Sequence, residues 1–330
     1  MKMPGKRTTL AFLAVALFSL TGCERHAKSE RYYLIATNIS LGYWQSANAG
    51  LQSAANEYGV TAIMDGPTTF DPEGEAAAFH AAVMQKPAGI LVSVADPSVM
   101  TPEINAALAA GIPVITIDSD DPESQRLYFI GTNNLQAGRL GAERVAAKLN
   151  GKGNVVFFTM PEQPNLVERL KGYKDAFANY PGIKIVDVFD MKGDSGNALD
   201  KTEEYLARTG KDKIDAFVCL EASAGADVAE AFKREKATGR VLVAMDVDVP
   251  TLNLVKQGII DSTISQKPYT MAFYGLKALD DIHHYPVKSL TKDYGLDPYS
   301  PFPAFVDTGV SIVDKSNVDA LLAGIKSQQH

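Results

Sequence analysis

The chain has very little cysteine. Its 330 residues include only Cys23 and Cys219, and Cys23 lies at the end of an N-terminal apolar segment. Because a disulfide needs two thiols, the folded part of the chain cannot contain an internal disulfide. Cys219 lies in the apolar run 216–220 (AFVCL). A buried, unreactive thiol is favoured there over a nucleophile.

Motifs for catalysis and cofactor binding are also absent. The chain has no G-x-x-x-x-G-K-[ST] loop and no G-x-G-x-x-G after a strand, so nothing supports a nucleotide cofactor. The five histidines lack metal-ligand spacing, and the adjacent pair His283 and His284 is interpreted as an exposed helix end. The string 193–196 (GDSG) matches a serine-protease motif of an all-β fold, whereas here a turn capped by Asp194 or Ser195 is favoured. We therefore expect no catalytic residue, no cofactor and no metal.

An excess of positive charge and a membrane-spanning run are lacking as well. The formal net charge of −7 argues against nucleic acid as a partner. The apolar segment 8–20 follows a basic start and is too short to span a bilayer, which is typical of a secretion signal. It ends in LTGC, which resembles a bacterial lipobox with Cys23 as the lipidated residue; the alternative is an ordinary signal peptide with an incidental cysteine. We interpret residues 1–22 as a lipoprotein signal peptide and residues 23–31 as a tether to a membrane surface.

A regular alternation of strands and helices fills the rest of the chain. Apolar runs typical of buried strands lie near residues 33–37, 60–64, 89–94, 113–117 and 127–130, and again at 155–159, 183–189, 216–220, 241–245 and 261–265. Segments with helical periodicity separate them, and such alternation forms parallel sheets with right-handed crossovers. Two series that join near Gly131 predict an α/β fold with two doubly wound, Rossmann-like lobes, each of roughly 150 residues.

Local signals place some element ends. Thr101-Pro102 predicts a helix start, and Asn134 predicts the cap of a helix over residues 135–149. A helix is expected over residues 268–282, a single final strand over 304–313 and a final helix over 317–325.

The stretch 33–50 (YLIATNISLGYWQSANAG) predicts a strand, a polar loop and a helix. Ligands of open α/β sheets bind outside the carboxyl ends of the strands, so we expect a cleft there. Thr37 and Asn38 are candidate hydrogen-bonding residues, and Tyr43 and Trp44 are candidates for a flat apolar wall. The alternative is that both aromatic side chains pack in the core.

Polar residues recur at the carboxyl ends of strands in both halves of the chain. They are Thr37, Asp118, Glu221, Asp246 and Gln266. Each alone is better explained by a helix cap or a turn, but parallel strands end on one side, so together they line one edge. Carboxylates accept strong hydrogen bonds from hydroxyl groups, and aromatic faces cover the C–H surface of a sugar ring. The set suits an uncharged, polyhydroxylated ligand.

Five segments resemble the type I periplasmic sugar-binding proteins, the ribose, galactose and xylose binders of ABC importers. They are ITID ending at Asp118, IGTNN at 130–134, NLVERLKGY at 165–173, AMD ending at Asp246 and STISQ at 262–266. The resemblance spans about residues 32–313. It implies two lobes that close on a sugar and are joined by three crossover strands, near 131–134, 266–268 and 302–308. The implied lobes are 32–132 with 267–303, and 133–266 with 304–330.

The resemblance also implies roles for individual residues. Thr37, Tyr43 and Trp44 match first-lobe contacts, with the two aromatics sandwiching the sugar ring. Asp118 matches a first-lobe carboxylate, while Asp246 and Gln266 match a second-lobe hydroxyl acceptor and a hinge amide. Asn165 is either a contact or only a helix N-cap, and Arg169 is either a contact or structural.

The chain departs from the family pattern at four positions that bear on the choice of sugar. Leu41 replaces a polar contact, Ser119 a basic residue, Val167 a contact arginine and Glu221 an asparagine.

From these features we expect a non-catalytic substrate-binding lipoprotein of a sugar ABC importer, binding a monosaccharide or polyol by hinge closure. Its expected partners are a membrane permease with its ATPase, or a chemoreceptor, and we expect a monomer anchored through Cys23 in the periplasm or at the cell surface. An extracytoplasmic sugar sensor for a chemoreceptor or a sensor kinase is the alternative. A secreted α/β enzyme is disfavoured because no nucleophile or metal constellation is evident.

Overall fold

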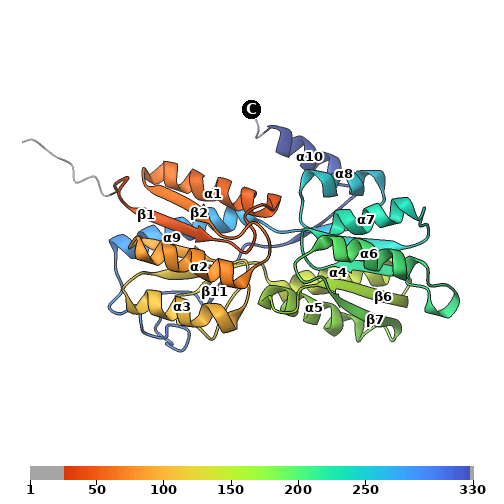
Figure 1. Ribbon diagram of the computed structural model, residues 1–330, viewed down its shortest axis with the longest axis horizontal. Helices are drawn as coiled ribbons and strands as arrows, with labels where there is room; N and C mark the ends of the chain where they lie inside the picture. The colour runs from red at the N-terminus through yellow and green to blue at the C-terminus, as the bar shows by residue number, and fades with distance from the viewer. Residues whose placement is uncertain (1–25, 328–330) are drawn as a thin grey trace, which may run out of the picture.

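Two six-stranded sheets, each flanked by helices, form two lobes that lie side by side (Figure 1). The computed structural model describes residues 26–327. The predicted signal peptide and the predicted lipidation site Cys23 lie outside the described residues. Each sheet has its own hydrophobic core, so each lobe is a separate packing unit.

The first lobe contains a fully parallel sheet with the strand order β11-β5-β4-β3-β1-β2. Its strands are β1 (Arg31–Ile35), β2 (Thr61–Asp65), β3 (Gly89–Val92), β4 (Val114–Ile117), β5 (Phe129–Gly131) and β11 (Phe305–Asp307). Its helices are α1 (Gly42–Tyr58), α2 (Pro72–Met84), α3 (Pro97–Ala109) and α9 (Pro268–His284). Helix α9 returns from the second half of the chain to pack on α1 and β3.

The second lobe repeats this order as β12-β10-β9-β8-β6-β7. Its strands are β6 (Lys152–Thr159), β7 (Gly182–Asp190), β8 (Ala216–Cys219), β9 (Val241–Met245), β10 (Ser262–Ser265) and β12 (Ser311–Asp314). Its helices are α4 (Asn134–Lys148), α5 (Pro164–Phe177), α6 (Ser195–Leu206), α7 (Ala224–Arg234), α8 (Val249–Gln257) and α10 (Val318–Ser327), with a 3₁₀ turn at Gly210–Asp212. Only β12 is antiparallel to its neighbour, β10. The α/β prediction with two doubly wound lobes is confirmed.

The chain crosses between the sheets three times. It crosses between β5 and α4, between β10 and α9, and between β11 and β12. The first two crossings lie where they were predicted. The third was placed too early, because residues 304–313 are not one strand: Phe305–Asp307 pairs with β5 and Ser311–Asp314 pairs with β10. The lobe boundary predicted at 303/304 therefore moves to residues 308–310.

Two helix starts also differ from prediction. Helix α3 begins at Pro97 because Asp96 caps it, accepting a hydrogen bond from the backbone N–H of Ser98 at 2.8 Å. Pro102 consequently lies inside this helix. Helix α4 is capped by Asn133, which accepts from Gln136 N–H, rather than by Asn134. The GDSG string is a helix cap as predicted, with Asp194 accepting from Gly196 N–H at the start of α6.

The described part of the predicted tether is packed on the first lobe. The Thr61 hydroxyl donates to Lys28 O at 2.8 Å, and the His26 ring stacks on Tyr58 with centroids 4.9 Å apart. Residues 26–30 therefore do not form a free linker.

The pair His283 and His284 ends α9. His283 is exposed, but the His284 side chain is only 16% exposed and contacts Glu30, which corrects the prediction for His284. Within residues 26–327, no helix combines the length and apolar character that crossing a bilayer requires.

Candidate functional site

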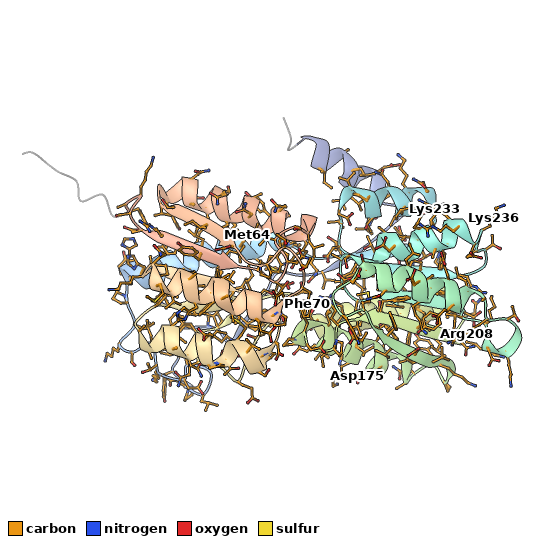
Figure 2. All side chains as sticks on the ribbon, viewed as in Figure 1. Met64, Phe70, Asp175, Arg208, Lys233 and Lys236 are labelled. Atoms are coloured by element: carbon orange, nitrogen blue, oxygen red, sulfur yellow. The ribbon has the colours of Figure 1, made fainter. Side chains whose placement is uncertain are left out.

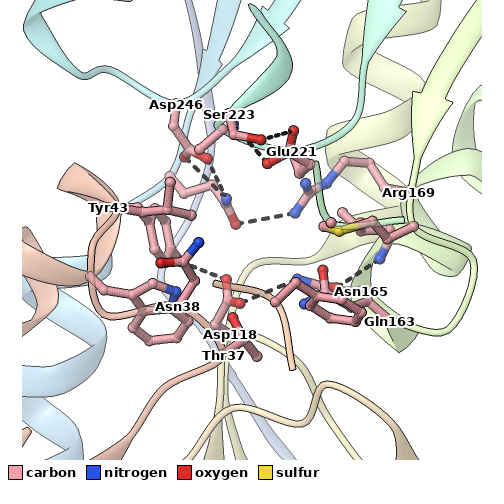
Figure 3. A pocket seen from close by; sticks show the side chains of 18 residues that line it. Thr37, Asn38, Tyr43, Asp118, Gln163, Asn165, Arg169, Glu221, Ser223 and Asp246 are labelled. Carbon is pink, nitrogen blue, oxygen red and sulfur yellow. Dashed lines mark hydrogen bonds between the residues drawn. The ribbon is translucent and has the colours of Figure 1, made fainter. Parts of the chain in front are cut away.

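A single cavity between the lobes collects all the predicted ligand-binding side chains (Figure 3). Its volume is about 60 Å³. Since one buried water needs about 10–15 Å³, the cavity has room for roughly four to six waters. The predicted residues that line it are Thr37, Asn38, Tyr43, Trp44, Asp118, Asn165, Arg169, Glu221, Asp246 and Gln266. That they contact a ligand remains a prediction.

Asp118 and Asp246 occupy equivalent positions in the two lobes. Asp118 follows β4 and Asp246 follows β9, the third strands from the crossover edge in the two matching sheet orders. Both have left-handed backbone conformations, with φ of 65° and 69°. Their backbone N–H groups donate to Ile130 O and Ile264 O on the next strand. Such a conformation costs a non-glycine residue roughly 1–2 kcal/mol, and Asp tolerates it better than most. The turn directs a carboxylate into the cleft from each lobe.

The Asp118 carboxylate holds the first-lobe wall together. Its Oδ1 accepts from the Tyr43 hydroxyl at 2.6 Å, and its Oδ2 accepts from Ser93 Oγ at 3.3 Å and from Asn165 Nδ2 at 3.2 Å. Burial raises the pKa of Asp118, and the Tyr43 hydrogen bond and the Arg169 charge oppose that rise. Asn165 belongs to α5 of the second lobe, so its amide reaches across the cleft. The N-cap of α5 is Gln163, which corrects the alternative that Asn165 is the cap.

The Asp246 carboxylate is held by Gln266, whose Nε2 donates to its oxygens at 3.1 and 3.3 Å. Burial raises the pKa of Asp246 to about 7; Arg169 and the Gln266 hydrogen bond oppose the rise, while Asp118 and Glu221 add to it. The carboxylates of Asp118, Asp246 and Glu221 thus face one small cavity, together with the guanidinium of Arg169.

Arg169 is that guanidinium, and it is 1% exposed. It donates to Leu220 O at the end of β8, to Asn134 Oδ1 at 2.7 Å in α4 and to Gln266 Oε1 at 3.3 Å. Its Nε has no partner among the described residues. Arg169 therefore ties three elements together and also lines the cavity, so both roles considered for it fit its position.

The Glu221 carboxylate is occupied by donors at the start of α7, namely the N-cap residue Ser223 and the first helical residue Ala224. Its Oε1 accepts from Ser223 Oγ and Ala224 N–H, each at 2.8 Å, and its Oε2 accepts from Ser223 N–H at 2.7 Å. Burial raises the pKa of its carboxyl group, against these three donors. The Glu221 side chain lines the cavity, and like Asp118 it already accepts three hydrogen bonds, whereas Asp246 accepts only from Gln266 Nε2 among the described residues.

A family model described as a periplasmic binding protein domain matches residues 32–283. The chain belongs to this family. A sugar-binding protein of a sugar ABC transporter from Bacillus halodurans has a solved structure with a TM-score of 0.75 and 33% identity, covering 88% of this chain and 99% of that one. A solute-binding protein from Burkholderia graminis, solved in complex with D-arabinose, has a TM-score of 0.78 and 27% identity over 88% of this chain and 96% of that one. The xylitol-binding protein of Mycolicibacterium smegmatis is 25% identical over 90% of this chain and 75% of its own length.

The predicted resemblance to type I periplasmic sugar-binding proteins is confirmed by these matches. Members of the family are binding proteins and act outside the cytoplasm.

The aromatic pair of this periplasmic binding protein does not form the predicted sandwich. The rings of Tyr43 and Trp44 contact each other edge to face, with centroids 5.1 Å apart and an interplanar angle of 84°. Two perpendicular rings cannot cover opposite faces of one sugar. Trp44 is 2% exposed and belongs to the first-lobe core, while the Tyr43 hydroxyl is used by Asp118. The alternative of core packing therefore holds for most of the Trp44 ring.

Phe70 supplies an aromatic surface that the sequence analysis missed. It lies at the junction of the lobes (Figure 2), lines the cavity and meets Gly193 of the second lobe. A Cβ at Gly193, whose φ is 75°, would lie 2.6 Å from Phe70 Cβ. Glycine is therefore needed there for the lobes to approach. The position of Phe70 directly before the Asp71-Pro72 helix start was the available signal, since it ends a βα loop on the same edge as Thr37.

The second lobe adds Met160, Gln163 and Leu166 to the lining, all on or beside the loop between β6 and α5. Gln163 is 6% exposed and provides a further amide. Two family contact positions do not reach the cavity here. Val167 is 51% exposed, and neither it nor the buried Ser119 lines the cleft, whereas Leu41 does. Gln163 therefore offers a polar group in the same part of the cleft from which Val167 points away.

Proposed function

We propose that this periplasmic binding protein binds a small monosaccharide or polyol as the substrate-binding component of an ABC importer. The observation that carries the proposal is the pair Asp118 and Asp246, which enter one small cavity from opposite lobes. A ligand hydroxyl that donates to either carboxylate gains a charge-assisted hydrogen bond, worth about 1.5–3 kcal/mol. Because the two acceptors are on separate lobes, only the closed arrangement offers both to one ligand.

The cavity's chemistry favours an uncharged ligand. The carboxylates of Asp118, Asp246 and Glu221 outnumber the single guanidinium of Arg169, so an anionic ligand would meet repulsion. The amides of Gln163, Asn165 and Gln266 both donate and accept, which matches hydroxyl groups. The cavity volume of about 60 Å³ is on the scale of a single sugar ring or a short polyol.

Closure is proposed to occur by hinge motion at the three crossings. The lobes have separate cores and are connected only at residues 132–133, 266–267 and 308–310. Ligand favours the closed state through contacts that exist only there. A few hydroxyl contacts from both lobes, minus ordering costs, correspond to about −8 kcal/mol, or micromolar binding.

The importer role is preferred to the sensor role because relatives are described as transporter components, including the proteins from Bacillus halodurans and Burkholderia graminis. The proposed partners are accordingly a membrane permease and its ATPase. The proposal also includes lipid anchoring through Cys23, which is supported by the LTGC segment. It includes a monomeric, non-catalytic protein as well, for which the binding-protein family is the support.

A thermal-shift screen against pentoses, hexoses, deoxy sugars and inositols tests the function. Ligand that binds only the folded state raises the melting temperature. Mass spectrometry of ligand released from the purified protein identifies what is carried from the cell. Stabilisation by one sugar or polyol supports the proposal, and no stabilisation by any of them contradicts it.

A further inference from the structure

A second cluster of polar side chains lies at the outer end of the first lobe (Figure 1), where residues before β1 meet the end of α9. It contains His26, Glu30, Asp280 and His284. His26 Nε2 lies 2.9 Å from Asp280 Oδ2, and His284 Nε2 lies 3.6 Å from Asp280 Oδ1 and 3.2 Å from Glu30 Oε2. One ligand atom each from His26, Asp280 and His284 lies within 4.8 Å of the other two. The ligand cleft, by contrast, lies at the carboxyl ends of the strands.

We propose that this cluster is a site for a divalent transition-metal ion of the zinc type, which fastens the N-terminal segment to the first lobe. The donor set is two imidazoles and one carboxylate, with Glu30 placed to supply a fourth ligand. Imidazole with carboxylate is a common zinc set, and two nitrogen ligands disfavour Ca²⁺ and Mg²⁺, which prefer oxygen. Asp280 and His284 are one helical turn apart on α9, so both face the same side.

The surroundings orient these ligands. The Tyr32 hydroxyl donates to Asp280 Oδ1 at 3.1 Å, and the backbone N–H of Ala27 donates to Glu30 Oε1 at 3.0 Å, leaving Oε2 toward His284. The His26 ring stacks on Tyr58, with an interplanar angle of 2°. Outer contacts of this kind fix ligand orientation in metal sites. The Asp280 side chain is 3% exposed and the His26 side chain 25% exposed, so the site is largely shielded and His26 is its more accessible ligand.

The charges of the cluster fit a divalent ion. Two carboxylates and two neutral imidazoles carry a charge of −2, which such an ion neutralises. A cluster of ion pairs between protonated histidines and the carboxylates would balance the charge without a metal. Metal binding distinguishes the proposed metal site from such an ion-pair cluster.

The site would connect the anchor region to the fold. His26 and Glu30 come from the segment after Cys23, whereas Asp280 and His284 come from the last helix of the first lobe. A bound ion therefore joins distant parts of the chain, since His26 and Asp280 are 254 residues apart in the sequence, as are Glu30 and His284. It would hold the segment next to Cys23 against the lobe without touching the cleft.

Calorimetric titration of the full chain with Zn²⁺ tests the site, with Co²⁺ absorption in the visible range as a report on coordination. The protein for this titration should carry no polyhistidine tag, because the tag would bind Zn²⁺, and should be purified in detergent because of the proposed lipid anchor. We expect one Zn²⁺ per chain, and affinity at least about tenfold lower in His26→Ala and in His284→Gln. His80→Ala is the matched control, because His80 also contacts a carboxylate, Glu103 at 3.4 Å, but belongs to no three-ligand group within residues 26–327. It should bind as the wild type does.

Proteolysis gives a second readout that does not depend on the strength of the titration signal. Lys28 is exposed within the fastened segment, so Zn²⁺ should slow tryptic cleavage after Lys28 in the wild type and in His80→Ala, but not in His26→Ala. Melting of each variant without metal checks that it is folded. Absence of Zn²⁺ binding by the wild type, or equal binding by all variants, would overturn the site and leave an ion-pair cluster. Sugar affinity should be the same in His26→Ala and wild type, which separates this test from the proposed function.

Discussion

Asn165 donates a hydrogen bond to Asp118 across the boundary between the two lobes. The distance from Asn165 Nδ2 to Asp118 Oδ2 is 3.2 Å, and the residues lie on α5 of the second lobe and after β4 of the first. Both side chains are at most 6% exposed. Because the contact joins the two lobes across the cleft, we expect it to favour a closed arrangement and to link that arrangement to the carboxylate that is proposed to bind the ligand.

Replacing Asn165 by Ala should weaken sugar binding roughly fivefold. A buried hydrogen bond contributes about 1 kcal/mol, and here it favours the closed state. Small-angle scattering should also show that more of the ligand-free protein is open. Asn179→Ala, at an exposed position of the same lobe, is the control and should bind normally. Equal affinities for the two variants would mean that the Asn165 contact does not support closure.

Alanine at Asp118 or at Asp246 should each reduce sugar affinity by more than about tenfold. The expected loss is a charge-assisted hydrogen bond of about 1.5 kcal/mol or more. Asp175→Ala is the control, since Asp175 is exposed on the second lobe and forms an ion pair with its helix neighbour Lys171. Titration calorimetry measures all three. If either cleft variant binds as tightly as Asp175→Ala, that aspartate is not a ligand contact.

Asp246 should make stability and binding depend on pH in opposite directions. Its pKa in the folded protein is about 7, raised from 3.8 mainly by burial. Between these two values the folded state holds a proton that the unfolded state has lost. The Asp246 contribution to the free energy of unfolding is therefore full below about pH 4 and is lost as pH rises through 7, at about 1.4 kcal/mol per pKa unit. Sugar affinity should instead rise from pH 5 to 8, because the ionised carboxylate is the better acceptor.

Comparison with Asp246→Asn isolates this group, since asparagine does not titrate. Denaturant unfolding at pH 5 and pH 8 gives the free energy of unfolding of both proteins. From pH 5 to pH 8 the wild type should lose stability relative to the variant. The pH dependence of sugar affinity should be flatter in the variant. Parallel profiles in both measurements would show that Asp246 keeps one charge state throughout.

Trp44 should report ligand binding through its fluorescence. It is the only tryptophan, and it both lines the cavity and packs in the core of the first lobe. Saturating sugar should shift or quench its emission because closure removes water from the cavity that it lines. Trp44→Phe should lose the signal while still binding. An unchanged spectrum under conditions where calorimetry detects binding would remove Trp44 from the site.

The two lobes were predicted well because apolar strand runs and segments with helical periodicity alternate along most of the chain. The inner parallel strands β3, β4 and β8 are buried along their whole length, and each forms a clear apolar run. The third crossing was misplaced because residues 304–313 are apolar on both sides of Asp307-Thr308-Gly309, where the chain leaves one sheet for the other. Gly309 has φ of 83°, and this single turn carries the only local signal of the change.

The site was predictable where it follows strand ends and not where it depends on loops. Asp118 and Asp246 come directly after apolar strands, so topology alone brings them together. Phe70 and Gln163 lie in or at the end of βα loops, whose shape local sequence does not determine. The perpendicular packing of Tyr43 on Trp44 and the meeting of His26 with His284 depend on contacts between distant elements, which no spacing rule contains.

Calorimetric titration of the wild-type protein and of the double variant Asp118→Ala/Asp246→Ala with pentoses, hexoses and their polyols tests the central claim most directly. We predict that at least one of these ligands binds the wild type at one site per chain with micromolar or tighter affinity. The same ligand should give no measurable binding to the double variant. Absence of binding to the wild type by every sugar and polyol, or equal binding by the double variant, would contradict a sugar site between the two aspartates.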